Sequence, residues 1–359
     1  MRLVTTRAIQ EGTELAKPIY NDKGQILIQK NVQLTPFMIQ RLKELGITYV
    51  YVRDSLTDDI MINSPISEDL RIEAIQSVKE SFSTYQKQGF GKKALLFEQT
   101  SARMSNMVDT MMAQIQENEE VISIMSDILI SDDYVFSHSV NVTIYALALA
   151  NEMNLPTKQI KTLGLGAMLH DVGKVFIPDK VLNKKGRLTN EEFQIIQTHP
   201  EKGFEFLRKS SSIPLLVAHC AFQHHERLDG SGYPRGITSP EIHPFGKILG
   251  VADVFDAVTS NRVYRDAMLP QEGLDILYSG SGTLFDQEMV RTFRKTIAVY
   301  PNGVTVELSD KRTAVVVKQN SPLYERPIVR VFKEEDTEVT PYELDLANVL
   351  DVTIVKYDI

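Results

Sequence analysis

The chain has 359 residues, more than one ordinary domain needs, and a hydrophobic content of 43% that can fill roughly two or three cores. Its formal net charge of −8 argues against a protein that coats a nucleic-acid polymer, because binding to the phosphate backbone normally needs a basic face. Cys220 is the single cysteine, which excludes an intrachain disulfide and a cluster of thiolate metal ligands.

The N-terminal end shows no export signal. Residues 1–7 lack the apolar region of a secretory signal, and no run of about eighteen apolar residues occurs in the chain. We therefore expect a cytoplasmic protein without a membrane span.

Residues 1–62 are predicted to form a small mixed α/β accessory domain. Apolar runs at residues 15–20 and 25–29 flank an Asn-Asp-Lys-Gly turn sequence and predict a hairpin. Thr35 is a suitable N-cap for a short helix that begins with proline, and residues 47–52 are predicted to form a strand.

Residues 67–130 are predicted to form a helical linker or bundle. Glu68 and Asp69 are favourable in the first turn of its first helix, and residues 88–91, with two glycines, predict a break. Bundle packing is favoured over a coiled coil, because no strict heptad persists. These helices could still support a homodimer.

Residues 131–297 carry successive helical patterns without strand alternation. Thr189 and Glu192 form a capping box, and Pro214 and Pro244 mark the starts of two further helices. An all-helical core of this kind can direct side chains from several helices toward one point.

Residues 298–359 return to β patterning. Strands are predicted at residues 304–308, 314–317, 328–332 and 352–355. The expected fold class is therefore mainly α, with an all-helical core, a small α/β N-terminal unit and a small β-rich C-terminal appendage.

Histidines and aspartates are spread along the helical core in a pattern that predicts a metal site. The residues concerned are His170 and Asp171 in the sequence HDVGK, His199, His224 and His225 in HHERLDGSGYP, and Asp253. Imidazole and carboxylate bind divalent ions such as iron or manganese, and a carboxylate can bridge a pair of them. The pattern predicts metal-dependent hydrolysis. His219 and His243 are interpreted as ordinary structural histidines.

The order of the HDVGK, HHERLDGSGYP and ILGVADVFDAVTSNRVYR segments resembles the HD-GYP family, cyclic di-GMP phosphodiesterases of the HD-domain metal-dependent phosphohydrolase superfamily. The resemblance covers about residues 131–297 and implies an HD-type catalytic core there. The flanking units resemble segments that accompany this domain in other bacterial proteins, with no activity implied.

The resemblance assigns roles residue by residue. It implies that Asp171 bridges two metals, with His138, His170 and Asp253 around the first. His199, His224 and His225 would surround the second. The residues implied to contact the substrate are Lys174, Tyr233, Arg262 and Arg265, of which Lys174 is also expected to take part in catalysis beside Asp171.

One position departs from the family pattern. Some members have a glutamate four residues before the first histidine and hold three metals, whereas this chain has Tyr134 there. We therefore expect two divalent ions, and regard Asp132 and Asp133 as a less favoured source of a third site.

The implied activity is hydrolysis of cyclic di-GMP to pGpG, GMP or both, by attack of a metal-bridging hydroxide. Another cyclic dinucleotide, such as cyclic GMP-AMP, is an open alternative, because metals recognise phosphate and not base. A catalytically silent cyclic-dinucleotide sensor is the alternative from another class. A nucleotide or alarmone hydrolase of the wider superfamily is disfavoured, because the GYP segment would then lack a purpose.

Overall fold

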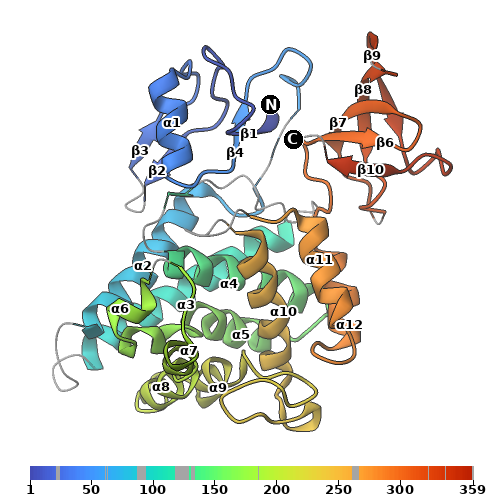
Figure 1. Cartoon of the computed structure of the whole chain (residues 1–359). Helices are drawn as coiled ribbons and strands as arrows, with labels where there is room; N and C mark the ends of the chain where they lie inside the picture. The colour runs from blue at the N-terminus through green and yellow to red at the C-terminus, as the bar shows by residue number, and fades with distance from the viewer. Residues whose placement is uncertain are drawn as a thin grey trace.

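The computed structural model describes the chain except for residues 22–24, 61, 63, 87–93, 118–128, 131–133, 185, 261–266, 322, 336 and 358–359. An N-terminal unit, drawn in blue, and a C-terminal β unit, drawn in red, lie beside each other on one side of a larger helical domain (Figure 1).

The N-terminal unit packs one helix against short strands. These elements are β1 (Arg2–Thr5), β2 (Ile19–Asn21), β3 (Ile26–Ile28), α1 (Pro36–Glu44) and β4 (Tyr49–Val52). Antiparallel pairing of β2 with β3 confirms the predicted hairpin, and β1 pairs antiparallel with β4. The side chain of Thr35 accepts a hydrogen bond from the backbone N–H of Met38, which confirms the predicted N-cap.

Two long helices connect this unit to the domain below. They are α2 (Glu68–Gln86) and α3 (Ala94–Glu117), and the predicted break at residues 88–91 lies outside the described residues. The two-residue strand β5 (Leu129–Ile130) pairs in parallel with β2. Leu129 and Ile130, at the end of the predicted helical segment, therefore form a strand, because pairing with the distant β2, and not a local pattern, makes these residues extended.

The larger domain is built from helices, and the described residues between 131 and 297 contain no named strand. The α-helices are α4 (Tyr134–Glu152), α5 (Thr157–Leu169), α6 (Asp179–Leu182), α7 (Asn190–Ile196), α8 (His199–Leu207), α9 (Leu215–Gln223), α10 (Pro244–Thr259), α11 (Pro270–Ser279) and α12 (Gln287–Arg294). Short 3-10 helices cover Val172–Phe176 and Ser239–Glu241. The capping box of Thr189 and Glu192 at the start of α7 is present as predicted.

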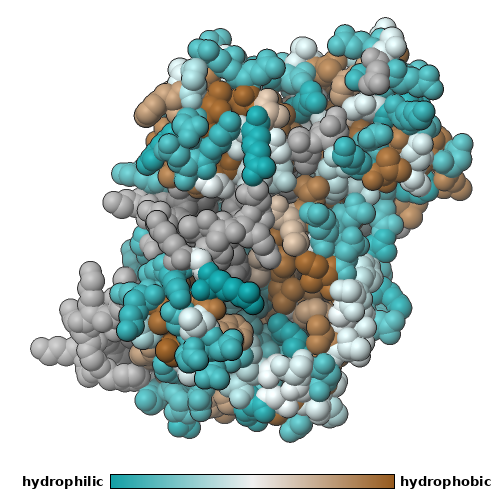
Figure 2. All heavy atoms as spheres, in the orientation of Figure 1, coloured by the Kyte–Doolittle hydropathy of each residue, from teal (hydrophilic) through white to brown (hydrophobic). Residues whose placement is uncertain are grey.

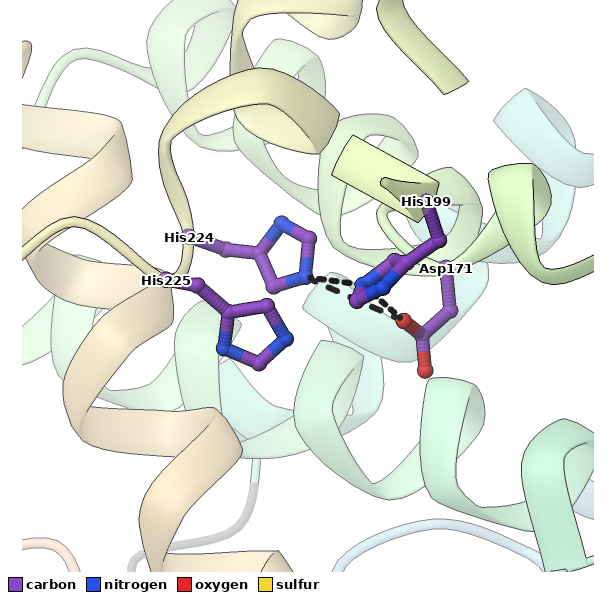
Figure 3. A group of neighbouring side chains, drawn as sticks. All are labelled: Asp171, His199, His224 and His225. Carbon is purple, nitrogen blue, oxygen red and sulfur yellow. Dashed lines mark hydrogen bonds and ion pairs between the residues drawn. The ribbon is translucent and has the colours of Figure 1, made fainter. Parts of the chain in front are cut away.

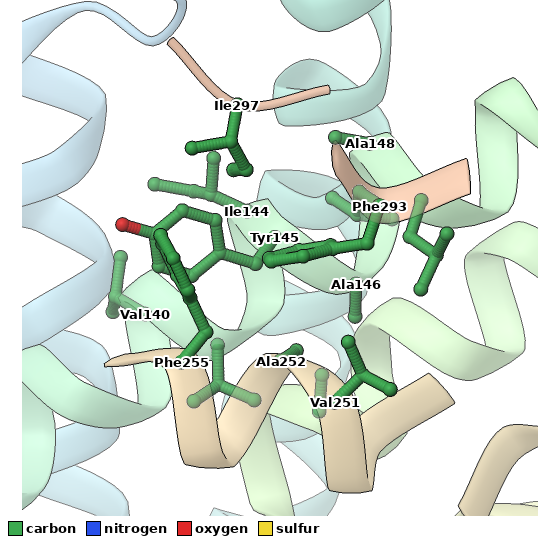
Figure 4. Packing of buried hydrophobic residues seen from close by; sticks show 14 of the residues in the cluster. Val140, Ile144, Tyr145, Ala146, Ala148, Val251, Ala252, Phe255, Phe293 and Ile297 are labelled. Carbon is green, nitrogen blue, oxygen red and sulfur yellow. The ribbon is translucent and has the colours of Figure 1, made fainter. Parts of the chain in front are cut away.

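Helix α4 occupies the centre of this domain, in contact with α2, α3, α5, α10 and α12. Tyr145 of α4 meets Phe255 and Phe293 edge to face, with ring centroids 5.1 and 5.9 Å apart, respectively (Figure 4). Buried aromatic contacts of this kind fix the relative position of the helices that carry them. The packing therefore fixes the position of α10 relative to α4, and both helices carry residues of the histidine and aspartate cluster.

The C-terminal unit is a five-stranded antiparallel sheet in the order β10-β6-β7-β8-β9. Its strands are β6 (Thr305–Leu308), β7 (Arg312–Lys318), β8 (Ile328–Glu334), β9 (Thr337–Asp345) and β10 (Ile354–Tyr357). Strand β9 was not predicted, because it is a mostly exposed edge strand that contains Pro341 and several charged residues.

The two smaller units touch each other directly. Arg330 donates two hydrogen bonds of 2.7 Å to the Asp59 carboxylate, and the backbone N–H of Leu3 donates to Gly303 O at 2.8 Å. Most of the face shown in Figure 2 is hydrophilic. None of the described helices has the length and apolar character needed to cross a membrane.

Candidate metal centre

Six separate elements bring the seven predicted metal ligands to one place. His138 lies within α4, His170 follows α5, Asp171 precedes the first 3-10 helix, His199 begins α8, His224 and His225 follow α9, and Asp253 lies within α10. All are buried except His225, which is partly exposed. Figure 3 shows Asp171 facing the imidazoles of His199, His224 and His225.

The ligand atoms form two adjoining groups in which all atoms lie within 4.8 Å of one another. One group contains His138, His170 and Asp171, and the other contains Asp171, His199, His224 and His225. Asp171 therefore belongs to both groups, the arrangement that a bridging carboxylate requires.

Asp253 lies beside these groups and belongs to neither. Its Oδ1 is 3.0 Å from His138 Nε2, and its Oδ2 is 3.5 Å from His225 Nδ1. The carboxylate thus spans the two groups from the side of α10.

The two oxygens of Asp171 face different groups. Oδ1 lies 3.3 Å from Nε2 of His199 and 3.8 Å from Nε2 of His224. Oδ2 lies 3.4 Å from His170 Nε2, 3.7 Å from His138 Nε2 and 2.5 Å from Lys174 Nζ. The ammonium group of Lys174 therefore contacts Asp171 on the side of His138 and His170.

Backbone carbonyls set the tautomer of three of the imidazoles. The Nδ1 atoms of His170, His199 and His224 lie 2.6, 2.7 and 2.9 Å from the carbonyl oxygens of Ala167, Ile196 and Ala221. A carbonyl oxygen can only accept, so each Nδ1 carries the proton and each Nε2 presents a lone pair to the centre. Second contacts of this kind commonly orient metal-binding histidines.

This arrangement leaves acceptor atoms without donors. His199 Nε2 and His224 Nε2 face each other at 3.2 Å, although neither carries a proton in these tautomers. His170 Nε2 and Asp171 Oδ1 are buried without a hydrogen bond, and the 3.3 Å approach of His199 to Asp171 Oδ1 is not aligned for one. Divalent cations at these positions would relieve the cost of burying acceptor atoms without donors. The residues present therefore fit divalent metal ions.

The protonation states of the cluster also favour metal binding. Burial holds the pKa of His224 and His225 well below 6.5, and the neighbouring histidines lower it further. Burial opposes ionisation of Asp171, but Lys174 and His170 outweigh it and keep the pKa of that carboxyl well below 3.8. At neutral pH His224 and His225 are therefore neutral imidazoles and Asp171 is a carboxylate, the protonation states that bind metals.

His138 behaves differently from the other imidazoles. Burial would lower its pKa, but hydrogen bonds to Asp253 and Asp256 outweigh this effect and raise the pKa to about 9. The sequence interpretation did not include Asp256, whose Oδ2 lies 2.7 Å from His138 Nδ1. Its position three residues after Asp253, and so on the same face of α10, was the available signal.

Gly173 is required by the close approach of two backbones. A Cβ atom at this position would lie 1.9 Å from the carbonyl oxygen of His199 and 2.7 Å from the backbone nitrogen of Gly203. Only glycine lets the 3-10 helix that follows Asp171 touch the start of α8. Gly173 thereby sets the distance between the candidate ligands Asp171 and His199.

The HHERLDGSGYP segment forms an ordered loop beside the second group. The Tyr233 ring stacks on His225 with centroids 4.6 Å apart. Glu226, which the sequence interpretation did not single out, is buried and accepts hydrogen bonds from the backbone N–H groups of Arg235 and Ile237 at 2.9 and 3.2 Å. A buried carboxylate thus holds the loop against the cluster.

Several sequence predictions are not tested by this geometry. Arg262, Arg265, Asp132 and Asp133 lie outside the described residues, and Tyr134 begins α4 with a side chain that is not described. Their roles stay predictions.

The two histidines interpreted as structural have local partners. His219 packs against Phe204, with ring centroids 5.1 Å apart, and the side chain of His243 caps α10. Neither belongs to the two groups of candidate ligands.

Comparison with known proteins adds an independent observation. Residues 123–289 match the family model described as HD domain. A cyclic di-GMP phosphodiesterase of Pseudomonas aeruginosa is 34% identical over 65% of this chain and 56% of its own length. Another, of Thermotoga maritima, is 34% identical over 66% of this chain and 65% of its own length.

A relative with a different substrate in its name also matches. The 3′3′-cGAMP-specific phosphodiesterase 3 of Vibrio cholerae is 34% identical over 48% of this chain and 37% of its own length. The chain thus spans between about a third and two thirds of the length of these relatives.

The helical scaffold, the shared aspartate and the matching family model define residues 123–289 as an HD domain. The HDVGK and HHERLDGSGYP motifs, in this order and at this cluster, resemble those of the HD-GYP family.

Proposed function

We propose that the chain is a metal-dependent phosphodiesterase that hydrolyses cyclic di-GMP to pGpG, GMP or both. The observation that carries this proposal is Asp171, whose two oxygens face two separate groups of imidazole nitrogens. The names of the relatives from P. aeruginosa and T. maritima support the substrate.

The proposed centre holds two divalent ions, iron or manganese. His138, His170, Asp171 and Asp253 would hold one, and Asp171 with His199, His224 and His225 the other. Bound ions of this kind lower the pKa of a coordinated water and neutralise charge on a phosphodiester. Because Tyr134 stands where some family members have a glutamate, we propose two ions and not three.

The chain's own cations would bind the substrate. Lys174 reaches the centre from a side chain that is 20% exposed, so its ammonium group can contact both Asp171 and an incoming phosphate. Arg262 and Arg265 are proposed to hold further phosphate oxygens. Tyr233 would contact the substrate at the mouth of the second group, where its ring covers His225.

Cyclic GMP-AMP is the second candidate substrate, because the name of the V. cholerae relative specifies this ring. The proposed contacts are to phosphate and do not choose between the bases. A silent sensor is less favoured, because every ligand position of the two-metal site holds a histidine or aspartate.

We also propose the division into an accessory domain of residues 1–62, a helical segment of residues 67–130, a catalytic domain of residues 131–297 and an appendage of residues 298–359. The flanking units are proposed to have structural or regulatory roles, and the helical segment to support a homodimer.

The test is incubation of manganese-loaded protein with cyclic di-GMP and, separately, with 3′3′-cyclic GMP-AMP, with the products resolved by chromatography. We expect linear products from cyclic di-GMP at the higher kcat/KM. A higher kcat/KM for cyclic GMP-AMP would make that ring the substrate in place of cyclic di-GMP. Binding of either ring without any product would support the silent sensor instead.

A further inference from the structure

A buried arginine outside the matched HD domain connects to the candidate metal centre. Arg71 lies on α2 and is 2% exposed. Its Nη2 donates a 2.8 Å hydrogen bond to Oδ1 of Asn141 in α4. Burying a guanidinium ion costs several kcal/mol unless other groups compensate its charge. The carboxylate of Asp256, which is hydrogen-bonded to Asn141, is such a group.

The hydrogen bonds continue from Asn141 to a metal-ligand candidate. Asn141 Nδ2 donates to Asp256 Oδ1 at 2.8 Å, and Asp256 Oδ2 lies 2.7 Å from His138 Nδ1. Arg71, Asn141, Asp256 and His138 are all buried. A continuous path of three hydrogen bonds therefore leads from α2, through α4 and α10, to the imidazole.

Each group in this path fixes the orientation of the next. Arginine can only donate, so it holds the oxygen of the Asn141 amide on its own side and the amide nitrogen toward Asp256. The carboxylate of Asp256 then accepts the Nδ1 proton of His138. His138 Nε2 is thereby left facing Asp253 and Asp171, at 3.0 and 3.7 Å.

Without Arg71, nothing in this path fixes the orientation of the Asn141 amide. The Asn141 amide could turn over and present its oxygen to the Asp256 carboxylate, which would repel it. Asp256 would also lose the favourable charge interaction with the guanidinium ion. Both effects would loosen the contact that orients His138.

We propose that Arg71 is a positioning residue for the metal centre and acts through Asn141 and Asp256 on His138. This inference rests on the proposed metal binding. It makes α2, which precedes residues 123–289 of the family match, a working part of the catalytic unit.

The test is titration of Mn²⁺ into the full chain by isothermal calorimetry, comparing wild type with Arg71→Met. Loss of an outer contact to a metal-binding histidine typically costs roughly tenfold or more in affinity. We expect about a tenfold loss at one of the two sites and little change at the other. Val78→Ala is the matched control, because Val78 is buried on the same helix and should lower stability while leaving both affinities unchanged.

Further variants test the path itself. Asn141→Leu should weaken the same site, and adding Arg71→Met to it should cause no further loss, because the two residues act in series. Should Arg71→Met fail to fold, Arg71→Lys is the variant to measure, because lysine keeps the positive charge without the planar guanidinium group. We expect it to lose less Mn²⁺ affinity than Arg71→Met, and at the same site.

Wild-type affinity at both sites in a folded Arg71 variant would overturn this inference alone. Failure of the wild type to bind Mn²⁺ would overturn it together with the proposed function.

Discussion

Replacement of Asp171 by asparagine removes one negative charge from the point where both ligand groups meet. The amide has nearly the same volume, so the packing around it should survive. It cannot give an anionic oxygen to each group, and it loses the ion pair with Lys174, whose Nζ is 2.5 Å from Oδ2. A charge-assisted contact is worth about 1.5–3 kcal/mol. Loss of one such contact from each ion predicts at least a tenfold fall in each metal affinity.

The assay is metal content after dialysis, measured by mass spectrometry, together with turnover of cyclic di-GMP. We expect Asp171→Asn to retain no stoichiometric metal and to lose measurable hydrolysis. Asp351→Asn is the control, because this aspartate is exposed in the C-terminal unit and should retain both properties. An Asp171→Asn protein with two bound ions and wild-type turnover would refute the bridging role.

Three further predictions concern the surroundings of the centre. Gly173→Ala should disturb His199, because a Cβ would lie 1.9 Å from its carbonyl oxygen; we expect lower thermal stability and weaker metal binding, and a wild-type melting temperature would contradict the close approach. Arg262→Ala should raise KM for cyclic di-GMP by roughly tenfold or more, the size of one charge-assisted contact, and a much smaller change in steady-state kinetics would exclude a phosphate role. The metal-free protein should melt at its highest temperature near neutral pH. His138, with a pKa raised from 6.5 to about 9, contributes stability below pH 6.5 that is lost as pH rises toward 9. His224, buried and neutral, costs stability as pH falls below 6.5. A melting temperature that does not vary with pH, or an alkaline decrease unchanged by His138→Gln, would contradict these charge states.

The candidate ligands could be predicted from sequence because their motifs are local. His170 with Asp171, and His224 with His225, are adjacent pairs, each followed within a few residues by a glycine that lets backbones approach. The resemblance to a known family supplied His138, whose own surroundings in the sequence carry no signal.

The residues that orient the ligands could not be predicted in this way. Arg71 reaches Asn141 across 70 positions of sequence, and Asn141 reaches Asp256 across 115. Such contacts depend on how α2, α4 and α10 pack, which no local pattern encodes. The same reasoning applies to β5, whose two residues are extended only because β2 lies beside them.

Hydrolysis of cyclic di-GMP by metal-free and manganese-reconstituted protein, followed by chromatography, tests the central claim most directly. We predict no product without metal and pGpG or GMP after reconstitution, with activity rising until two ions are bound per chain. Equal hydrolysis with and without metal, or intact cyclic di-GMP in the fully loaded protein, would contradict a two-metal phosphodiesterase.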